Sequence, residues 1–311
     1  MRGLTLGLLA GLFASCSLPA FPSGQSLEHV RRWWIVLGDP QGAAGADWIR
    51  ALQGADLAIV NHAPPPGASS SALVLGYLSI GEAETTRAYW PQIARRPFVV
   101  ERNPDWPDNY RVDIRDSRWQ AILLDEEIPR LLAAGYQGLM LDTLDNAPYL
   151  ERREPTRFEG SRDGLRDFLG RVRKKFPKLI LLANGTDTLV DAAPFVDGYV
   201  TEGIFATYDA SPLRYRRTTA SEREWRLAQV KAALDRARRP VFAVEYAGPE
   251  SGELAAWAVE QSRQHGFRPF VTEKSLNRLP DVAVAATFPT GPAGPRSTPA
   301  PCPTDSATCP R

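Results

Sequence analysis

The chain of 311 residues has few histidines and cysteines and almost no net charge. Its three histidines, His29, His62 and His265, form no i, i+4 pair, which argues against a histidine-based zinc centre. None of its three cysteines lies in the middle of the chain, which argues against a buried thiol nucleophile. With 37 basic and 36 acidic side chains, the net charge of +1 gives no electrostatic basis for binding nucleic acid.

Two common catalytic motifs are also missing. There is no G-x-S-x-G elbow of the kind that presents a serine nucleophile. Gly38, Gly42 and Gly45 resemble a phosphate-binding loop, but no Lys-Ser or Lys-Thr follows them. Carboxylates alone can hold Mg²⁺ or Ca²⁺, so a carboxylate-bound metal stays open as an alternative. We expect no cofactor and no metal.

The first residues read as an export signal. Arg2 precedes an apolar run over 4–14 that is too short to span a bilayer, and small residues lead into Cys16. The stretch 12–16 resembles a bacterial lipobox, which predicts a signal peptide over 1–16, lipidation of Cys16 and a linker over 17–30. The product would be an exported, membrane-anchored lipoprotein. Plain secretion or periplasmic release, and an ordinary N-terminal helix, are the alternatives.

The last residues, 283–311, are dominated by Pro, Ser, Thr and Gly and lack periodicity. Such a segment cannot bury enough apolar surface to offset its ordering entropy, which predicts a disordered tail. Cys302 and Cys309 are candidates for a disulfide in an oxidising compartment, with two unpaired thiols as the alternative.

Between these ends, over 31–282, apolar runs of strand length alternate with segments of helical period. The runs are rich in Val, Ile and Leu, as expected for strands buried on both faces. Eight strands with helical crossovers over roughly 250 residues predict an α/β fold of the (β/α)₈ TIM-barrel type, in a single domain. An open doubly wound sheet is the alternative. The long gap after the third strand predicts an insertion between strands three and four. The predicted strands are 33–38, 57–61, 73–79, 138–143, 179–184, 198–202, 240–245 and 268–273.

Local signals place the starts of three helices. Ser161 is predicted to cap one helix, and Ser221 with Glu224 to form the capping box of another. Asp116 is predicted to open a third, in which Pro129 should introduce a kink.

Polar side chains gather at the ends of the predicted strands. In (β/α)₈ barrels these carboxyl ends carry the chemistry, and a buried polar group is costly unless it is paired. A ring of such groups therefore predicts a polar pocket, although any single member could instead cap a helix or form a salt bridge. The ring comprises Asp39, Asn61, Ser79, Glu82, Glu84, Asp142, Asp145, Asn184, Glu202, Glu245 and Glu273.

Three segments, 76–84 (GYLSIGEAE), 135–145 (GYQGLMLDTLD) and 182–185 (LANG), carry a resemblance. In that order and spacing they resemble glycoside hydrolase family 114, the endo-α-1,4-polygalactosaminidase group. The resemblance implies a (β/α)₈ barrel, with Asp142 at the end of strand four as nucleophile and Glu202 at the end of strand six as acid/base. It also implies a retaining glycosidase that cleaves an α-linked amino-sugar polysaccharide.

The remaining ring residues are predicted to bind substrate. Several carboxylates would give the pocket a negative potential that suits a cationic amino sugar. Trp90, Trp106 and Tyr110 in the insertion could stack on sugar rings or simply pack. We expect a monomer, and a glycan-binding barrel without activity is the alternative function. The predicted substrate-binding set is Asp39, Ser79, Glu82, Glu84, Asp145, Asn184, Glu245 and Tyr246.

Overall fold

The computed structural model describes residues 27–40, 42–61 and 72–280. The predicted signal peptide, Cys16, most of the linker, and the tail with Cys302 and Cys309 lie outside the described residues. Within the described part, no helix is long and apolar enough to cross a membrane.

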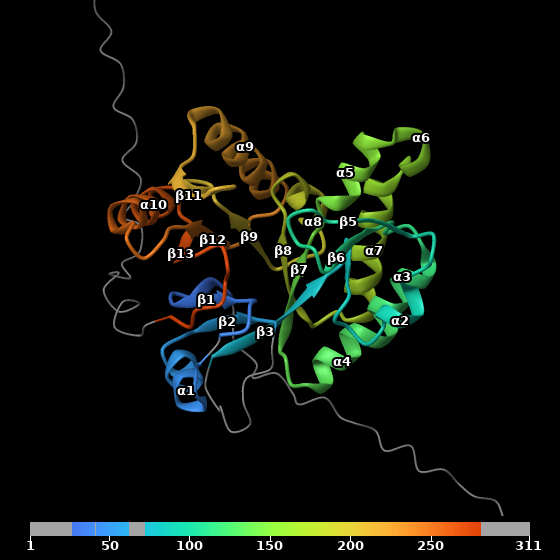
Figure 1. The fold of residues 1–311 in the computed structure, drawn as a ribbon, viewed down its shortest axis with the longest axis horizontal. Helices are drawn as coiled ribbons and strands as arrows, with labels where there is room; N and C mark the ends of the chain where they lie inside the picture. Colours follow the sequence, from blue (N-terminus) through green and yellow to red (C-terminus); the bar gives the residue numbers. More distant parts are fainter. Residues whose placement is uncertain (1–26, 41, 62–71, 281–311) are drawn as a thin grey trace, which may run out of the picture.

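Eight parallel strands form the barrel, and they confirm the predicted fold. They pair in the order β1-β2-β3-β7-β8-β9-β12-β13, with helices on the outside (Figure 1). Every predicted strand is present, with bounds that agree to within two residues. The strands are β1 (Trp33–Val36), β2 (Leu57–Val60), β3 (Leu73–Ser79), β7 (Gly138–Asp142), β8 (Ile180–Asn184), β9 (Gly198–Glu202), β12 (Val241–Tyr246) and β13 (Arg268–Thr272).

The first and last strands meet, which distinguishes a barrel from an open sheet. The indole Nε1 of Trp33 in β1 donates to the carbonyl of Arg268 in β13 at 3.0 Å. Above it, the backbone nitrogens of Leu37 and Gly38 both donate to the carbonyl of Leu276, at 2.9 and 3.0 Å. The chain after β13 therefore closes the ring against β1, and the doubly wound alternative is wrong.

Strand alternation divides the apolar residues into two cores. In β1, Trp33 and Ile35 point into the barrel, while Trp34 and Val36 point toward the helices. The same alternation runs through the other strands. One apolar cluster therefore fills the interior of the barrel, and a larger one lies between the sheet and the helices. The barrel cluster includes Leu57, Ile59, Leu75, Met140, Leu182, Val200 and Phe242.

The outer layer contains helices of very different lengths. The long ones, α7 (Ser161–Lys175), α9 (Ala220–Arg236) and α10 (Gly252–Gln264), cover the later strands (Figure 1). The others are η1 (Leu27–His29), α1 (Gly45–Gln53), α2 (Trp90–Ile93), α3 (Ser117–Ala121), η2 (Ile122–Glu127), α4 (Ile128–Ala133), α5 (Asn146–Arg153), α6 (Pro155–Phe158), η3 (Thr186–Thr188) and α8 (Leu189–Ala192).

Two small antiparallel sheets lie outside the barrel order. The predicted insertion after β3 forms a sheet of β4 (Glu82–Glu84), β6 (Asn109–Val112) and β5 (Val99–Arg102), in that order. After β9, β10 (Ala206–Ala210) and β11 (Leu213–Arg217) form a hairpin that the sequence analysis did not predict. Both additions follow the carboxyl ends of barrel strands, so both lie at the side of the barrel where its mouth opens.

Two of the predicted helix caps are wrong. Helix α7 begins at Ser161 itself, whose buried hydroxyl has no hydrogen-bond partner among the described residues. Instead, the Glu151 carboxylate accepts from the backbone nitrogens of Gly160 and Arg162. For α9, the capping box lies two residues earlier than predicted, and Thr219 and Glu222 form it.

The two alternative capping boxes at α9 share the S/T-x-x-E pattern, so the choice depends on tertiary contacts. Glu222 also accepts two hydrogen bonds from Arg216 of the preceding hairpin, at 2.9 and 3.0 Å. The Arg216 side chain therefore stabilises the capping box that begins at Thr219 over the one predicted at Ser221. The prediction for Asp116 is confirmed, since its carboxylate caps α3 through the backbone nitrogen of Arg118. Before Pro129, the helix widens into the π-helical segment η2, where a missing backbone donor is tolerated.

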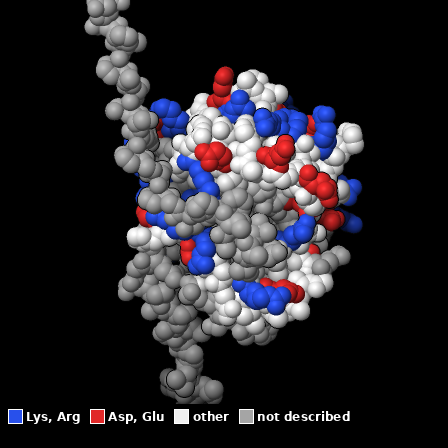
Figure 2. All heavy atoms as spheres, turned by 90° about the vertical axis from the view of Figure 1, so that its left-hand side faces the viewer, with Lys and Arg blue, Asp and Glu red and all other residues white. Residues whose placement is uncertain are grey.

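Acidic and basic side chains alternate over the described surface of the face shown in Figure 2. No continuous patch of one sign appears among the described residues there. This mixture agrees with the net charge of +1.

Candidate active site

Five consecutive barrel strands each end in a polar side chain that points into the barrel. Alternation sets this direction, because each of these residues lies two positions after an inward-facing core residue. The side chains therefore meet above the apolar plug, at the carboxyl end of the barrel. They are Ser79 of β3, Asp142 of β7, Asn184 of β8, Glu202 of β9 and Tyr246 of β12.

Asn184 joins the two predicted catalytic carboxylates. Its side-chain nitrogen donates to Oδ1 of Asp142 at 3.0 Å and to Oε1 of Glu202 at 2.6 Å. The two carboxylates thus lie on either side of one amide, although 60 positions in the sequence numbering separate 142 from 202. Strand β8 lies between β7 and β9 in the sheet, which is why its last residue can reach both.

Two tyrosine hydroxyls complete the hydrogen bonding of the pair. Tyr246 donates to Oε2 of Glu202 in a short hydrogen bond, and Tyr77 donates to Asp142. Burial and the charge of Asp142 raise the pKa of Tyr77, and burial and the charge of Glu202 raise the pKa of Tyr246, each well above the ordinary value. Both hydroxyls therefore stay protonated and act as donors.

Electrostatics separates the carboxylates. Burial, then the charge of Glu202, raises the pKa of Asp142 from 3.8 to about 8. Asp145 reaches solvent at the mouth, yet desolvation and the charges of Asp187, Glu82 and Glu202 raise its pKa to about 6. Because two close carboxylates cannot both ionise cheaply, the pair of Asp142 and Glu202 retains one proton near neutral pH.

The backbone next to Asp142 is strained. Thr143 has a φ of 60°, a left-handed conformation that is unfavourable for a β-branched residue. Its hydroxyl is held by Ser79 Oγ at 2.8 Å and by the backbone nitrogen of Gly81 at 2.9 Å. A side chain at Gly81 would collide with the carbonyl of Thr143. Ser79 therefore helps to hold the turn after Asp142, rather than facing the pocket unpaired.

Glu82 binds three asparagine side chains. It is 2 % exposed and accepts from the amides of Asn103, Asn109 and Asn146, at 2.8, 3.0 and 3.0 Å. These residues come from the insertion and from α5, so Glu82 ties the insertion to the segment that follows Asp142. The side chain lies near the site but is fully occupied by protein partners.

Glu84 and Asp39 are placed away from the bridged pair. Glu84 pairs with Arg87 at 2.6 Å, and the same Arg87 donates to Asn61 at 2.6 Å, so two predicted ring members share one arginine. Asp39 is an exposed residue at the edge of the mouth. Glu273, at the end of the eighth strand, pairs with Arg278.

Glu245 points out of the barrel. It is 0 % exposed and lies between the sheet and α10, where Ser262 donates to it at 3.1 Å. Its other oxygen accepts from the backbone nitrogens of Phe205 and Ala206, at 3.0 and 2.7 Å. Desolvation raises its pKa to about 7. The next residue, Tyr246, faces inward instead, so the strand end contributes its tyrosine and not its glutamate to the pocket.

The aromatic residues of the insertion divide in the same way. Trp90 and Tyr110 pack on each other, with ring centroids 4.8 Å apart. Trp106 remains 46 % exposed. Sequence reasoning missed Tyr77, Thr143 and Tyr208 near the site. Only Tyr77 had a usable signal, because it is inward-facing and lies two residues before the end of its strand.

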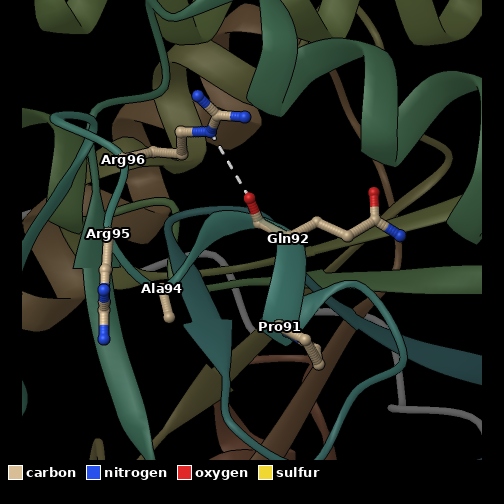
Figure 3. A pocket seen from close by; sticks show the side chains of 5 residues that line it. All are labelled: Pro91, Gln92, Ala94, Arg95 and Arg96. Atoms are coloured by element: carbon tan, nitrogen blue, oxygen red, sulfur yellow. Dashed lines mark hydrogen bonds between the residues drawn. The ribbon is translucent and has the colours of Figure 1, made fainter.

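Figure 3 shows a hollow of a different kind on the insertion. It is lined by Pro91, Gln92, Ala94, Arg95 and Arg96, and Arg96 Nε donates to the carbonyl of Gln92 at 3.4 Å. It contains no carboxylate and no barrel-strand residue. Within residues 27–40, 42–61 and 72–280, no group of histidine, cysteine or acidic side chains has the arrangement of a metal site.

A (β/α)₈ barrel with two bridged carboxylates at the ends of strands four and six belongs to the class of barrel glycosidases. Residues 52–287 match the model of glycoside-hydrolase family GH114, and the chain belongs to this family.

Two solved structures and one further protein are similar to this chain. The glycoside hydrolase domain of PelA from Pseudomonas aeruginosa is 25% identical, with a TM-score of 0.67, over 80% of this chain and 97% of that one. Aspergillus fumigatus Ega3 in complex with galactosamine shares the fold at 15% identity and a TM-score of 0.55, over 80% and 93%. An uncharacterised protein of Deinococcus radiodurans is 27% identical over 260 residues, covering 81% of this chain and 76% of its own.

Proposed function

We propose that this glycosidase cleaves an α-linked, galactosamine-type polysaccharide, with Asp142 and Glu202 as its two catalytic carboxylates. The observation that carries the proposal is the Asn184 amide, which holds one oxygen of each carboxylate. The Ega3 structure is of a complex with galactosamine, which supports an amino sugar as the substrate unit. The carboxylate of Asp145, on which the charge of Glu202 acts, would attract its ammonium group.

The spacing favours retention of configuration. The two hydrogen bonds from Asn184, 3.0 and 2.6 Å laid end to end, limit how far apart the nearest carboxylate oxygens can be. That limit is close to the roughly 5–5.5 Å of retaining enzymes and below the roughly 6.5–9.5 Å of inverting ones. With this spacing, one carboxylate would attack the anomeric carbon directly.

The roles follow the family resemblance, with Asp142 as nucleophile and Glu202 as acid/base. In the free enzyme, however, burial raises the pKa of Asp142 to about 8, which places the shared proton on Asp142. The 2-ammonium of a bound galactosamine lies one carbon from the anomeric centre. Its positive charge would lower the pKa of Asp142, so that this carboxylate ionises and can attack the anomeric carbon.

We also propose that the enzyme works outside the cytoplasm, as a lipid-anchored or secreted monomer that binds its polysaccharide without a cofactor. The evidence for export is the sequence pattern ending at Cys16.

Activity on a partly deacetylated α-1,4-galactosamine polymer tests the function. The wild type should release oligosaccharides, and Asp142→Asn and Glu202→Gln should each lose at least about a hundredfold. Asp163→Asn, which changes an exposed carboxylate on α7, is the matched control and should keep full activity. Binding of the polymer without release of oligosaccharides by the wild type would instead indicate a glycan-binding barrel.

Azide rescue separates the two roles on an activated α-glycoside. If Asp142 is the nucleophile, Asp142→Ala with azide should give the β-glycosyl azide, and Glu202→Ala should give the α-glycosyl azide. The opposite pair of products would assign attack to Glu202. Formation of neither, together with inverted product from the wild type, would contradict retention.

A further inference from the structure

Three segments that are distant in sequence meet beside Glu202. The ammonium of Lys274, just after β13, lies 5.8 Å from the ring centroid of Trp106 and 5.2 Å from that of Tyr208. Trp106 belongs to the insertion and Tyr208 to the hairpin after β9. The backbone nitrogen of Lys274 also donates to the hydroxyl of Tyr215 at 3.1 Å, which fixes the lysine against the hairpin.

This cluster continues directly into the catalytic pair. Tyr208 packs edge-on against Tyr246, with ring centroids 5.0 Å apart and an interplanar angle of 87°. Tyr246 in turn donates its hydroxyl to Glu202. Trp106, Tyr208 and Lys274, which we call the Lys274 wall, therefore lie on the Glu202 side of the cleavage point and not on the Asp142 side.

The wall has the properties of a surface that contacts a ligand. Trp106 is 46 % exposed, whereas the ring of Trp119 on the barrel side of α3 is fully buried. Unlike the similarly exposed Trp225, Trp106 has the ammonium of Lys274 against its ring and lies in the cluster that leads to Glu202, so its apolar face is available to stack on a sugar ring at the site. Tyr208 is partly buried.

The two sides of the site differ in charge. The Asp142 side carries the further carboxylate Asp145, and Asp187, which also acts on Asp145, is ion-paired with Arg152 at 3.1 Å. The Glu202 side carries the ammonium of Lys274, which forms no ion pair with any described carboxylate. Asp105, next to Trp106, is the acidic group that acts on Tyr208 from this wall and partly offsets the lysine. A sugar ammonium would be attracted on one side and repelled by Lys274 on the other.

We propose that the Lys274 wall is the subsite for the leaving-group sugar, and that Lys274 makes it select an uncharged, N-acetylated residue over a cationic one. The inference rests on the proposed function, because Glu202 protonates the oxygen of the leaving sugar. The enzyme then cuts between a cationic residue on its carboxylate side and a neutral residue on its lysine side.

The products show which sugar occupied the leaving-group subsite, because the leaving sugar becomes the new non-reducing end. On a partly acetylated galactosamine polymer, mass-spectrometric sequencing should find N-acetylated residues enriched at new non-reducing ends. In Lys274→Met this enrichment should be lost, and kcat/KM on the fully deacetylated polymer should rise about fivefold at low salt and less at high salt. Lys231→Met, which removes an exposed lysine of α9, is the control and should match the wild type.

A tryptophan pair tests the stacking face. Trp106→Ala should raise KM about tenfold with little change in kcat. Trp225→Ala, on α9 and 50 % exposed, should change neither. Equal effects of the two tryptophan variants, or the same product ends from wild type and Lys274→Met, would overturn the subsite.

Binding separates this inference from the proposed activity. Affinities of fully deacetylated and N-acetylated galactosamine oligomers are measured for the wild type, Lys274→Met and Lys231→Met. If no polymer is cleaved but only Lys274→Met gains affinity for the cationic oligomer, the hydrolysis proposal fails and the subsite stands. If oligomers bind with no dependence on Lys274, the subsite is wrong whatever the activity.

Discussion

At the amino-terminal end of the barrel interior, the strands point Trp33, Leu57, Met140 and Leu182 at one another, and these side chains are buried. Two residues after Met140 and Leu182, β7 and β8 point the carboxylate of Asp142 and the amide of Asn184 inward. Both ends use the same alternation, and only the residue types change. The amino-terminal end of the interior, here called the lower end, stabilises the fold by burying apolar area. The carboxyl-terminal end, here called the upper end, gives up that stabilisation to hold two carboxylates close together.

The largest effect should come from the lower end. Leu182 is fully buried in the barrel core, two residues before Asn184. Leu182→Ala should lower the free energy of unfolding by about 2–5 kcal/mol, because it removes apolar area and leaves a cavity. Denaturant titration measures the loss. The kcat of the folded fraction should stay close to that of the wild type, and a large fall in kcat would mean that the two ends are not separable.

The converse change is at the upper end of the same strand. Asn184→Ala removes the donor that joins Asp142 and Glu202, and kcat/KM should fall about a hundredfold, as when one preorganised donor is lost. The denaturation midpoint should move much less than for Leu182→Ala. Stability and activity measured on both variants thus test the same comparison from opposite directions.

Asp142→Asn should stabilise the fold. In the unfolded chain Asp142 ionises near pH 4, whereas in the folded protein burial and Glu202 raise its pKa to about 8. Folding therefore carries a cost that is absent below pH 4 and grows until pH 8. The variant should gain about 1–2 kcal/mol at pH 8 and almost nothing at pH 4, measured by thermal denaturation at both. A pH-independent gain would contradict the raised pKa.

The smallest effect should come from Glu245→Gln. A glutamine can keep accepting from Phe205 and Ala206 through its oxygen, and the carboxyl, with its pKa raised to about 7, is already half neutral. Activity should change less than about threefold and stability less than about 1 kcal/mol. The same substitution at Glu202, on the neighbouring strand but facing inward, is expected to abolish most of the activity. Similar losses of activity at both positions would contradict the distinction between the inward and outward faces of the strands.

Apolar runs that alternate with segments of helical period were enough to predict the barrel, all eight strands and the insertion, because these patterns act between near neighbours in the chain. The hairpin of β10 and β11 escaped, since its strands are polar and packed by tyrosines. The cap at Thr219 was misplaced because Arg216 decides between two equivalent local patterns.

By itself, the sequence determined which strands end in a polar residue. Through resemblance, it also predicted Asp142 and Glu202 as the catalytic pair. Tertiary structure decided which polar ends meet. Glu245 and Tyr246 are neighbours in sequence, yet only the tyrosine enters the pocket, because strand pleating sends adjacent side chains to opposite faces. The strand order decided the rest of the pair, since β8 lies between β7 and β9 and so brings Asn184 between two carboxylates. Closure of the barrel carries Lys274, after the last strand, to Trp106 in the insertion.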